Sequence, residues 1–263
     1  MAKDKDPIDV AASIRRSIEV SPRGWRRLRF HSLRDLFDFQ AWSAQRKELV
    51  DKVFAEQGIL AVPTIGEAGL DDWVVLSMPT LPVRDDSRPD PRPTTEWFDH
   101  LESVDLNSER EVEVHFASPL FHALGYDDDR EAAGYQFPTW EGVHTRIAEA
   151  DLLYFADGRR SVDDADPLVL VECKSSDRAP DAGTGQARGY AYWIKPAYYV
   201  ITNGNVLVAY NYQGGAVPDV KVLDVKRSEL RVRFDEIYQV LNPKAALETR
   251  RGKAAKLTGQ APA

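Results

Sequence analysis

Three residues with side chains suited to catalysis lie on two short apolar stretches of the chain: Asp151, Glu172 and Lys174. Residues 149–155 (EADLLYF) and 167–174 (PLVLVECK) each have the composition of a β-strand, and a charged turn separates them. Alternate side chains of a strand share a face, so Glu172 and Lys174 point the same way. Burying an acid and a lysine is costly unless they bind each other or a ligand. This cost indicates a functional site.

The chemistry that these residues suggest is metal-assisted hydrolysis. Asp151 and Glu172, on neighbouring strands, would supply the carboxylate oxygens that Mg²⁺ prefers. The metal would polarise a phosphodiester and lower the pKa of a bound water. Lys174 would orient or deprotonate that water, or neutralise the charge that develops at the phosphoryl group. Mn²⁺ is expected to substitute for Mg²⁺.

Each residue taken singly also has an ordinary structural explanation. Asp151 could cap a turn or pair with Arg146, and Glu172 with Lys174 could form a surface ion pair of little energetic value. Gln186 could be any polar residue of a helix. Their order and combined spacing favour the metal site over these explanations.

The order of an aspartate, a hairpin and then Glu-x-Lys resembles the PD-(D/E)xK nuclease superfamily, which has the restriction-endonuclease-like fold. Residues 107–126 (NSEREVEVHFASPLFHALGY) are similar to the helix that opens the nuclease domain of type I restriction enzyme motor subunits. In that family the leading acid, here Glu109, contributes to the metal site. Glu111 and Glu113 are nearby alternatives for this role.

Two further segments carry the same resemblance. Gln186 and Tyr190 lie one helical turn apart. They resemble a Gln-x-x-x-Tyr element in which the glutamine approaches the water and phosphate and the tyrosine supports it. Residues 198–211 (YYVITNGNVLVAYN) are similar to the closing hairpin of that fold, with its turn at Asn203-Gly204. The resemblance implies a Mg²⁺-dependent DNA endonuclease that acts in restriction, another defence system or DNA processing.

Four regions are expected along the chain. Residues 1–78 should form a small N-terminal helix and hairpin module, with a helix or helix pair at 32–57. Residues 79–95 are rich in proline and charge, which predicts a linker. Residues 96–242 should form the nuclease-like domain, an α/β (α+β) core with a central mixed β-sheet flanked by helices. Residues 243–263 are basic and lack aromatic residues, which predicts a disordered tail.

Two segments are candidates for contact with nucleic acid. Residues 127–146 are expected to be loops beside the substrate cleft, where aromatic residues and Arg146 would touch DNA or pack against the core. Residues 15–34 are rich in arginine interleaved with aromatic residues, a pattern that can bind a phosphate backbone. The alternative for that stretch is a solvated helix face or a docking surface. The basic candidates are Arg23, Arg26, Arg27, Arg29 and Arg146, and the aromatic ones are Tyr135, Phe137 and Trp140.

Composition and charge limit how the protein could contact DNA and in which compartment it is expected. The net charge of −8 in 263 residues requires any DNA contact to be local. The single cysteine, Cys173, excludes an internal disulfide and fits a reducing cytoplasm. No segment has the apolar length of a membrane span, and the first residues lack the apolar stretch of a signal peptide. A cytoplasmic protein without a membrane partner is expected.

The expected partners follow from the resemblance and from a missing motif. The sequence has no phosphate-binding G-x-x-x-x-G-K-(S/T) loop, so other defence-system subunits would supply ATPase activity or specificity. Restriction-like nucleases often cut duplexes as dimers, so a homodimer is a further expectation. Two other classes stay open: a nucleic-acid-binding or assembly module that keeps the nuclease fold without catalysis, and a structural or regulatory protein that binds no nucleic acid.

Overall fold

The computed structural model describes residues 5–21, 24–70, 72–78, 92–141, 144–158, 162, 166–215 and 217–258. The chain divides into two compact units, Met1–Asp105 and Leu106–Ala263. Most of the expected linker at residues 79–95 lies outside the described residues. Helix α4 (Thr95–Ser103), which was expected to begin the second domain, packs against α1 and belongs to the first unit.

The first unit combines helices with a small antiparallel sheet. Its three strands lie in the order β1–β3–β2, and the expected helix pair is present as α2 and α3. Gly58 ends α3 in the left-handed conformation that favours glycine (φ 70°). The bounds are α1 (Pro7–Val20), β1 (Trp25–Arg29), α2 (Phe30–Leu36), α3 (Ala44–Gln57), β2 (Leu60–Val62) and β3 (Trp73–Ser77).

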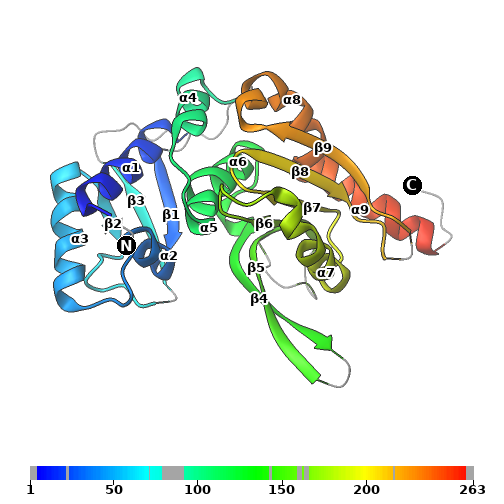
Figure 1. Ribbon diagram of the computed structural model, residues 1–263, viewed down its shortest axis with the longest axis horizontal. Helices are drawn as coiled ribbons and strands as arrows, with labels where there is room; N and C mark the ends of the chain where they lie inside the picture. The colour runs from blue at the N-terminus through cyan, green and yellow to red at the C-terminus, as the bar shows by residue number, and fades with distance from the viewer. Residues whose placement is uncertain are drawn as a thin grey trace. The chain divides into compact units, whose positions relative to one another are not determined.

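The second unit is built on a mixed six-stranded sheet, which confirms the expected mixed α/β class. The strands lie side by side in chain order, and only β6 and β7 are parallel (Figure 1). A parallel pair needs a crossover connection, and α7 (Thr184–Ile194) provides it. The strands are β4 (Glu131–Glu141), β5 (His144–Phe155), β6 (Pro167–Cys173), β7 (Tyr198–Thr202), β8 (Val206–Asn211) and β9 (Val220–Lys226).

The helical segment before the sheet is continuous but irregular. It consists of α5 (Glu109–Glu111), the π-helical turns η1 (Val112–Ala117) and α6 (Ser118–Ala123). Ser108 caps its start by accepting a hydrogen bond from the Glu111 amide. Pro119 has no N–H to donate to the turn before it, and the wider π-helical turns occur there.

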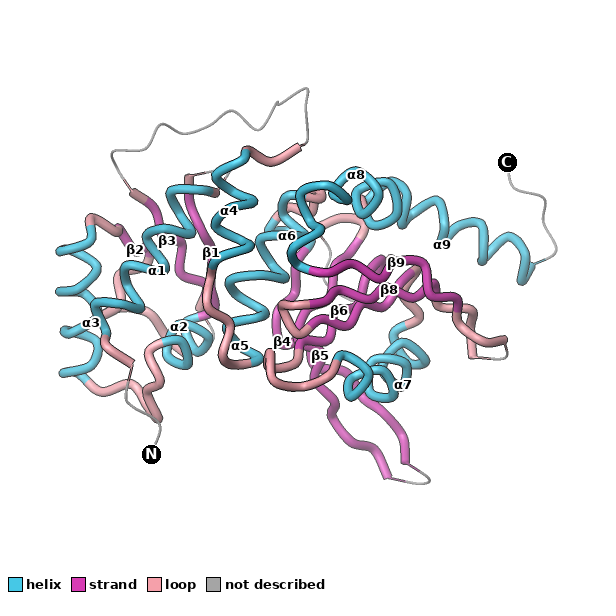
Figure 2. Tube along the Cα trace, turned by 45° about the horizontal axis from the view of Figure 1, so that its top comes forward, coloured by secondary structure: helices cyan, strands magenta, loops and turns pink. Residues whose placement is uncertain are grey.

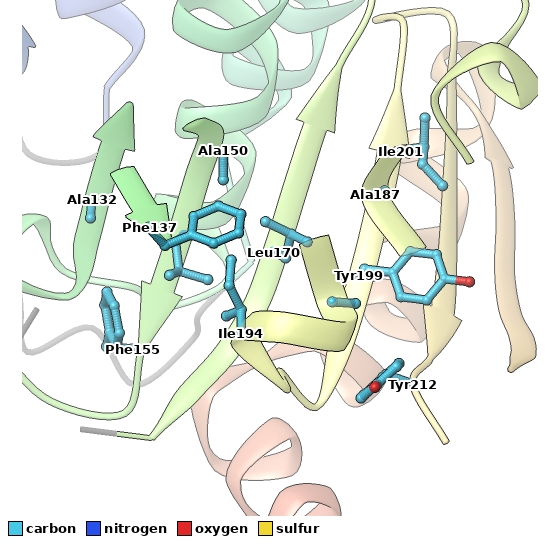
Figure 3. Packing of buried hydrophobic residues seen from close by; sticks show 12 residues of the cluster. Ala132, Phe137, Ala150, Phe155, Leu170, Ala187, Ile194, Tyr199, Ile201 and Tyr212 are labelled. Carbon is cyan, nitrogen blue, oxygen red and sulfur yellow. The ribbon is translucent and has the colours of Figure 1, made fainter. Parts of the chain in front are cut away.

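Helices cover both faces of the sheet. On one face, a cluster of buried side chains joins the strands to α7, and it includes Leu153, Leu170, Ala187 and Ile194 (Figure 3). Successive strand residues face opposite ways, so Tyr154 lies on the other face, where it stacks on Phe121 of α6 at 4.5 Å. The turns η2 (Asp128–Arg130), η3 (Pro180–Gly183) and η4 (Arg227–Glu229) and the helices α8 (Leu230–Leu241) and α9 (Pro243–Thr258) complete the unit.

The expectation of loops at residues 127–146 was wrong for most of that segment. After the short turn η2, it forms β4 and the beginning of β5, a long antiparallel hairpin. Its far end passes α7 and extends away from the remaining strands (Figures 1 and 2). At residues 144–147 of β5 both faces are exposed, so the alternation of apolar and polar residues by which a half-buried strand is recognised is absent there.

The expectation of a disordered tail was wrong for residues 243–258, which form α9, and the rest of that tail lies outside the described residues. Tertiary contacts hold this helix: Thr249 shares a hydrogen bond of 2.9 Å with Tyr198, and Lys253 donates to the Ala197 carbonyl at 2.7 Å. Arg250 forms an ion pair with Asp166 at 2.8 Å. Within the described residues, no helix combines the length and apolar character needed to cross a membrane.

Candidate active site

The pairing of β5 with β6 brings two of the predicted acids together. The antiparallel register pairs Leu152 with Val171 at the end of the paired stretch, and Asp151 and Glu172 are the next residues along the two strands. The two acids are close enough for the charge of Asp151 to raise the pKa of Glu172. Glu172 shares a face of β6 with Leu170, whose side chain packs under α7. Glu172 therefore lies on the α7 face of the sheet, next to Asp151.

Lys174 completes this cluster at the end of β6. Its Nζ donates a hydrogen bond of 2.5 Å to Glu172 Oε1, and its backbone amide donates to the Thr202 carbonyl at 2.8 Å. Asp151 Oδ2 accepts a hydrogen bond of 2.7 Å from the Cys173 amide. The structure thus joins the three predicted residues through β6 and its immediate extension.

One carboxylate oxygen of the cluster is buried and has no protein partner in the described part of the chain. Glu172 is only 1% exposed, and its Oε2 makes no hydrogen bond. Leaving a buried carboxylate oxygen unsatisfied costs free energy, and a bound cation would remove that cost.

The pKa shifts of the cluster also favour a bound cation. Burial, reinforced by the negative charge of Asp151, raises the pKa of Glu172 to about 7, although Lys174 opposes the shift. Burial also raises the pKa of Asp151, against the hydrogen bond from the Cys173 amide and the charge of Lys174. Burial lowers the pKa of Lys174, but the hydrogen bond and negative charge of Glu172 outweigh burial, so the pKa of Lys174 is raised. Two acids that ionise reluctantly and lie close enough to repel each other are a natural cation site.

The structure distinguishes among the three acids of the preceding helix. Glu111 Oε2 accepts a hydrogen bond of 2.7 Å from the Asn107 amide, so it stabilises the helix start. Glu113 is buried and bound to Arg110 at 2.6 and 2.7 Å. Glu109 is exposed, and its charge acts on the pKa values of Asp151, Glu172 and Lys174. Of the three, Glu109 is best placed to assist the cluster.

Arg110 is a residue of this site that the sequence interpretation missed. Its positive charge lowers the pKa of Asp151, against the larger effect of burial. Burial raises the pKa of its partner Glu113 to about 8, and the Arg110 charge limits that rise. The three-residue spacing of Arg110 and Glu113 on a helix was the available signal, because such residues are neighbours on a helix surface.

Helix α7 begins beside Lys174. A Cβ on Gly183, the residue before α7, would lie 3.2 Å from Lys174 Cε and 3.0 Å from Ile201 Cγ2, so the absence of a side chain lets the lysine pass. Gln186 is exposed and donates its side-chain hydrogen bond to the Tyr190 hydroxyl at 3.1 Å. Tyr190 packs edge-on against Phe137 of β4. The pairing of Gln186 with Tyr190 is present, whereas the approach of Gln186 to a water or phosphate stays a prediction.

The basic candidates are scattered. Arg23 lies outside the described residues, and Arg146 is exposed on the β4–β5 hairpin. The expectation that Arg26 contacts DNA conflicts with its position, since it is 5% exposed on the inward face of β1. Arg27 and Arg29 both place their guanidinium groups over the Trp73 ring, at 4.2 and 4.3 Å. Because Trp25–Arg29 is a strand, the helix-face alternative is wrong there.

The donor set fits a sparsely coordinated Mg²⁺. Among the described residues, no three His, Cys, Asp or Glu side chains are grouped closely enough to hold a metal ion. Mg²⁺ in phosphoryl-transfer sites is commonly held by one or two carboxylates together with waters and substrate phosphates. Asp151 and the unsatisfied Glu172 Oε2 match that requirement.

Comparisons with known proteins give little further information. No family model matches the chain, and no curated protein matches it. Among solved structures, it is similar to one described as "The fragment structure of a putative HsdR subunit of a type I restriction enzyme from Vibrio vulnificus YJ016". The TM-score is 0.35 at 21% identity, over 51% of this chain and 27% of that chain. A similarity this weak does not establish a shared fold, and the chain spans about a quarter of that protein.

Proposed function

We propose that this protein is a metal-dependent nuclease that hydrolyses DNA phosphodiester bonds. The observation that carries the proposal is a pair of neighbouring carboxylates, the partly buried Asp151 and the buried Glu172, with Lys174 hydrogen-bonded to Glu172. An ordinary structural ion pair would need one acid and one base; a second acid near the first adds repulsion that a bound cation would relieve. The core would be restriction-endonuclease-like, as the sequence motifs imply.

Each residue has a proposed role. Asp151 and Glu172 would hold Mg²⁺ or Mn²⁺, with Glu109 in support. The ion would polarise the phosphodiester and lower the pKa of a bound water. Lys174 acts as a hydrogen-bond donor to a carboxylate, the behaviour of an ammonium group, which supports charge neutralisation at the phosphoryl group over proton abstraction. Gln186, supported by Tyr190, would orient the water or the phosphate.

The proposal also covers the compartment, the partners and the DNA contacts of the enzyme. The enzyme would act in the cytoplasm in restriction, another defence system or DNA processing. It would work as a homodimer or with other subunits that supply ATPase activity or specificity. Arg27, Arg29 and Arg146 are the described basic residues proposed to contact the DNA backbone, and Arg23 is a further candidate.

A plasmid-nicking assay with Mg²⁺ and with Mn²⁺ tests this function. Asp151→Asn and Lys174→Ala should abolish cutting, while Lys221→Ala should not, because Lys221 is an exposed lysine on β9 that pairs with Asp224. Circular dichroism would verify that each variant is folded. Undiminished cutting by folded Lys174→Ala would overturn the assignment.

The alternative is a nuclease-fold module that binds nucleic acid or organises an assembly without catalysis. The lack of a three-ligand metal group among the described residues favours this alternative. Calorimetric titration with Mg²⁺ and Mn²⁺ distinguishes the two. DNA binding without metal binding at millimolar concentration would select the non-catalytic module.

A further inference from the structure

Three aromatic side chains, two of them exposed and one partly buried, meet where the β4–β5 hairpin passes the end of α7. Trp140 of β4 is 52% exposed, and Tyr192 of α7 is 55% exposed. Trp193, between them, has its ring centroid 5.1 Å from that of Trp140 and 5.2 Å from that of Tyr192. We call Trp140, Tyr192 and Trp193 the aromatic surface.

Among the described residues, those of β5 at the far end of the hairpin are exposed. Residues 144–147 are all exposed, and Ile147 is 66% exposed. The two strands continue past α7 as a ribbon (Figures 1 and 2). A two-stranded ribbon is marginally stable by itself, and exposed aromatic residues that are grouped together usually mark a binding surface.

The aromatic surface is continuous with the candidate active site along α7. Gly183, the residue before the helix, lies against Lys174; the helix carries Gln186 and Tyr190 in its middle and ends with Trp193 and Ile194. Gly183 and Trp193 are separated by a helical rise of about 15 Å. A stacked nucleic-acid strand advances about 3.4 Å per nucleotide, so this rise equals about four or five nucleotides.

Charge near the aromatic surface suits a polyanion. Arg146 lies on β5 in the hairpin, and Lys195 is exposed at the end of α7. Arg188 lies one helical turn before Tyr192, with 52% of its side chain exposed while it pairs with the buried Asp219. Cations around flat aromatic rings match a nucleic-acid strand, since rings stack on bases and cations contact phosphates.

We infer that the aromatic surface binds unpaired bases of the DNA strand that enters the candidate active site. The substrate class is therefore DNA with a single-stranded segment about four or five nucleotides from the cleaved phosphate, given the rise along α7. This inference rests on the proposed nuclease function and specifies its substrate.

The test measures binding without cleavage. Fluorescence anisotropy in EDTA would follow a labelled single strand of about 16 nucleotides and, separately, its duplex. Trp140→Ala should weaken binding of the single strand roughly 5- to 150-fold, the loss expected for one stacked base. Trp140→Phe, which keeps an aromatic ring, should restore most of the affinity. Val232→Ala, at an 81% exposed apolar residue of α8, is the matched control.

Several outcomes would overturn the inference. One is that folded Trp140→Ala binds the single strand with unchanged affinity. The others are that the wild type binds only the duplex, or that it binds neither the single strand nor the duplex. If Trp140→Ala converts a dimer into a monomer and leaves DNA binding intact, the surface is an interface between copies instead. If the wild type nicks DNA in a metal-dependent way and Trp140→Ala binds the single strand as tightly as the wild type, this inference is refuted and the nuclease function is not. Trp140-dependent binding without nicking by the wild type would refute the nuclease function alone.

Discussion

The variant Glu172→Gln should stabilise the metal-free protein at neutral and alkaline pH. Burial next to Asp151 raises the pKa of Glu172 from 4.5 to about 7 in the folded protein. Below pH 4.5 the carboxyl is protonated in both the folded and the unfolded state, so it costs nothing. As pH rises from 4.5 to 7 the unfolded state ionises first, and the folded state loses relative stability. Each pH unit in this interval corresponds to about 1.4 kcal/mol, so ionised Glu172 costs on the order of 3 kcal/mol at pH 8.

Glutamine keeps the shape of the side chain but cannot ionise, so it removes this cost. For a protein of this size, a change of about 3 kcal/mol corresponds to a rise in Tm of roughly 6–12 °C. The measurement is thermal unfolding of both proteins in EDTA, at about pH 4, where the two should agree, and at about pH 8. A titration with Mg²⁺ completes the design. The metal should stabilise the wild type and leave Glu172→Gln almost unchanged, because a neutral amide is a much poorer ligand for a hard cation.

Two results would refute this reasoning. The first is Glu172→Gln less stable than the wild type at pH 8 in EDTA, which would mean that the Lys174–Glu172 ion pair stabilises the fold more than ionisation of Glu172 destabilises it. The second is equal stabilisation of both proteins by Mg²⁺, which would place the metal elsewhere. Lys221→Ala provides a control for general effects of charge, because its position on β9 is exposed.

Two further predictions concern the scaffold around the site. Gly204→Ala should destabilise the fold by about 1–3 kcal/mol in urea unfolding, because Gly204 has φ +78° and a Cβ there would collide with the Leu106 side chain. Gly189→Ala, on the open side of α7, should be neutral or slightly stabilising; equal effects of the two substitutions would contradict this account. Burial opposes ionisation of Glu131, but His122 together with hydroxyl hydrogen bonds lowers its pKa from 4.5 to about 2. Glu131 therefore contributes stability above pH 4.5 that disappears as pH falls to 2. Glu131→Gln should lose about 3 kcal/mol near pH 7 and progressively less in acid unfolding, and a loss independent of pH would show that charge is not the cause.

Local sequence signals determined much of the scaffold. The apolar runs at 149–155 and 167–174 became parts of β5 and β6, and Asn203-Gly204 became the connection between β7 and β8. Ser108 caps its helix, and Gly58 ends α3. These features depend on backbone preferences and on hydrogen bonds within a few residues, which is information that a single segment contains.

Other features depended on contacts between distant segments. Helix α9 has a polar sequence, and its order comes from Tyr198, Ala197 and Asp166, which are remote in the chain. Helices gain most of their stability from such packing, so composition alone predicted disorder. The far end of the long β4–β5 hairpin was missed for a related reason, since strand pairing holds residues 144–147, which are all exposed.

The candidate site shows the same division. The sequence by itself predicted Asp151, Glu172 and Lys174 as candidates, because their order and spacing next to apolar strands favour a metal site. Only the tertiary structure brought Asp151 close to Glu172 and gave Glu111 and Glu113 partners of their own, leaving Glu109 exposed. Only the tertiary structure buried Arg26 and brought Trp140 against Trp193. Register, burial and the choice of hydrogen-bond partner are properties of packed neighbours, and a linear pattern does not contain them.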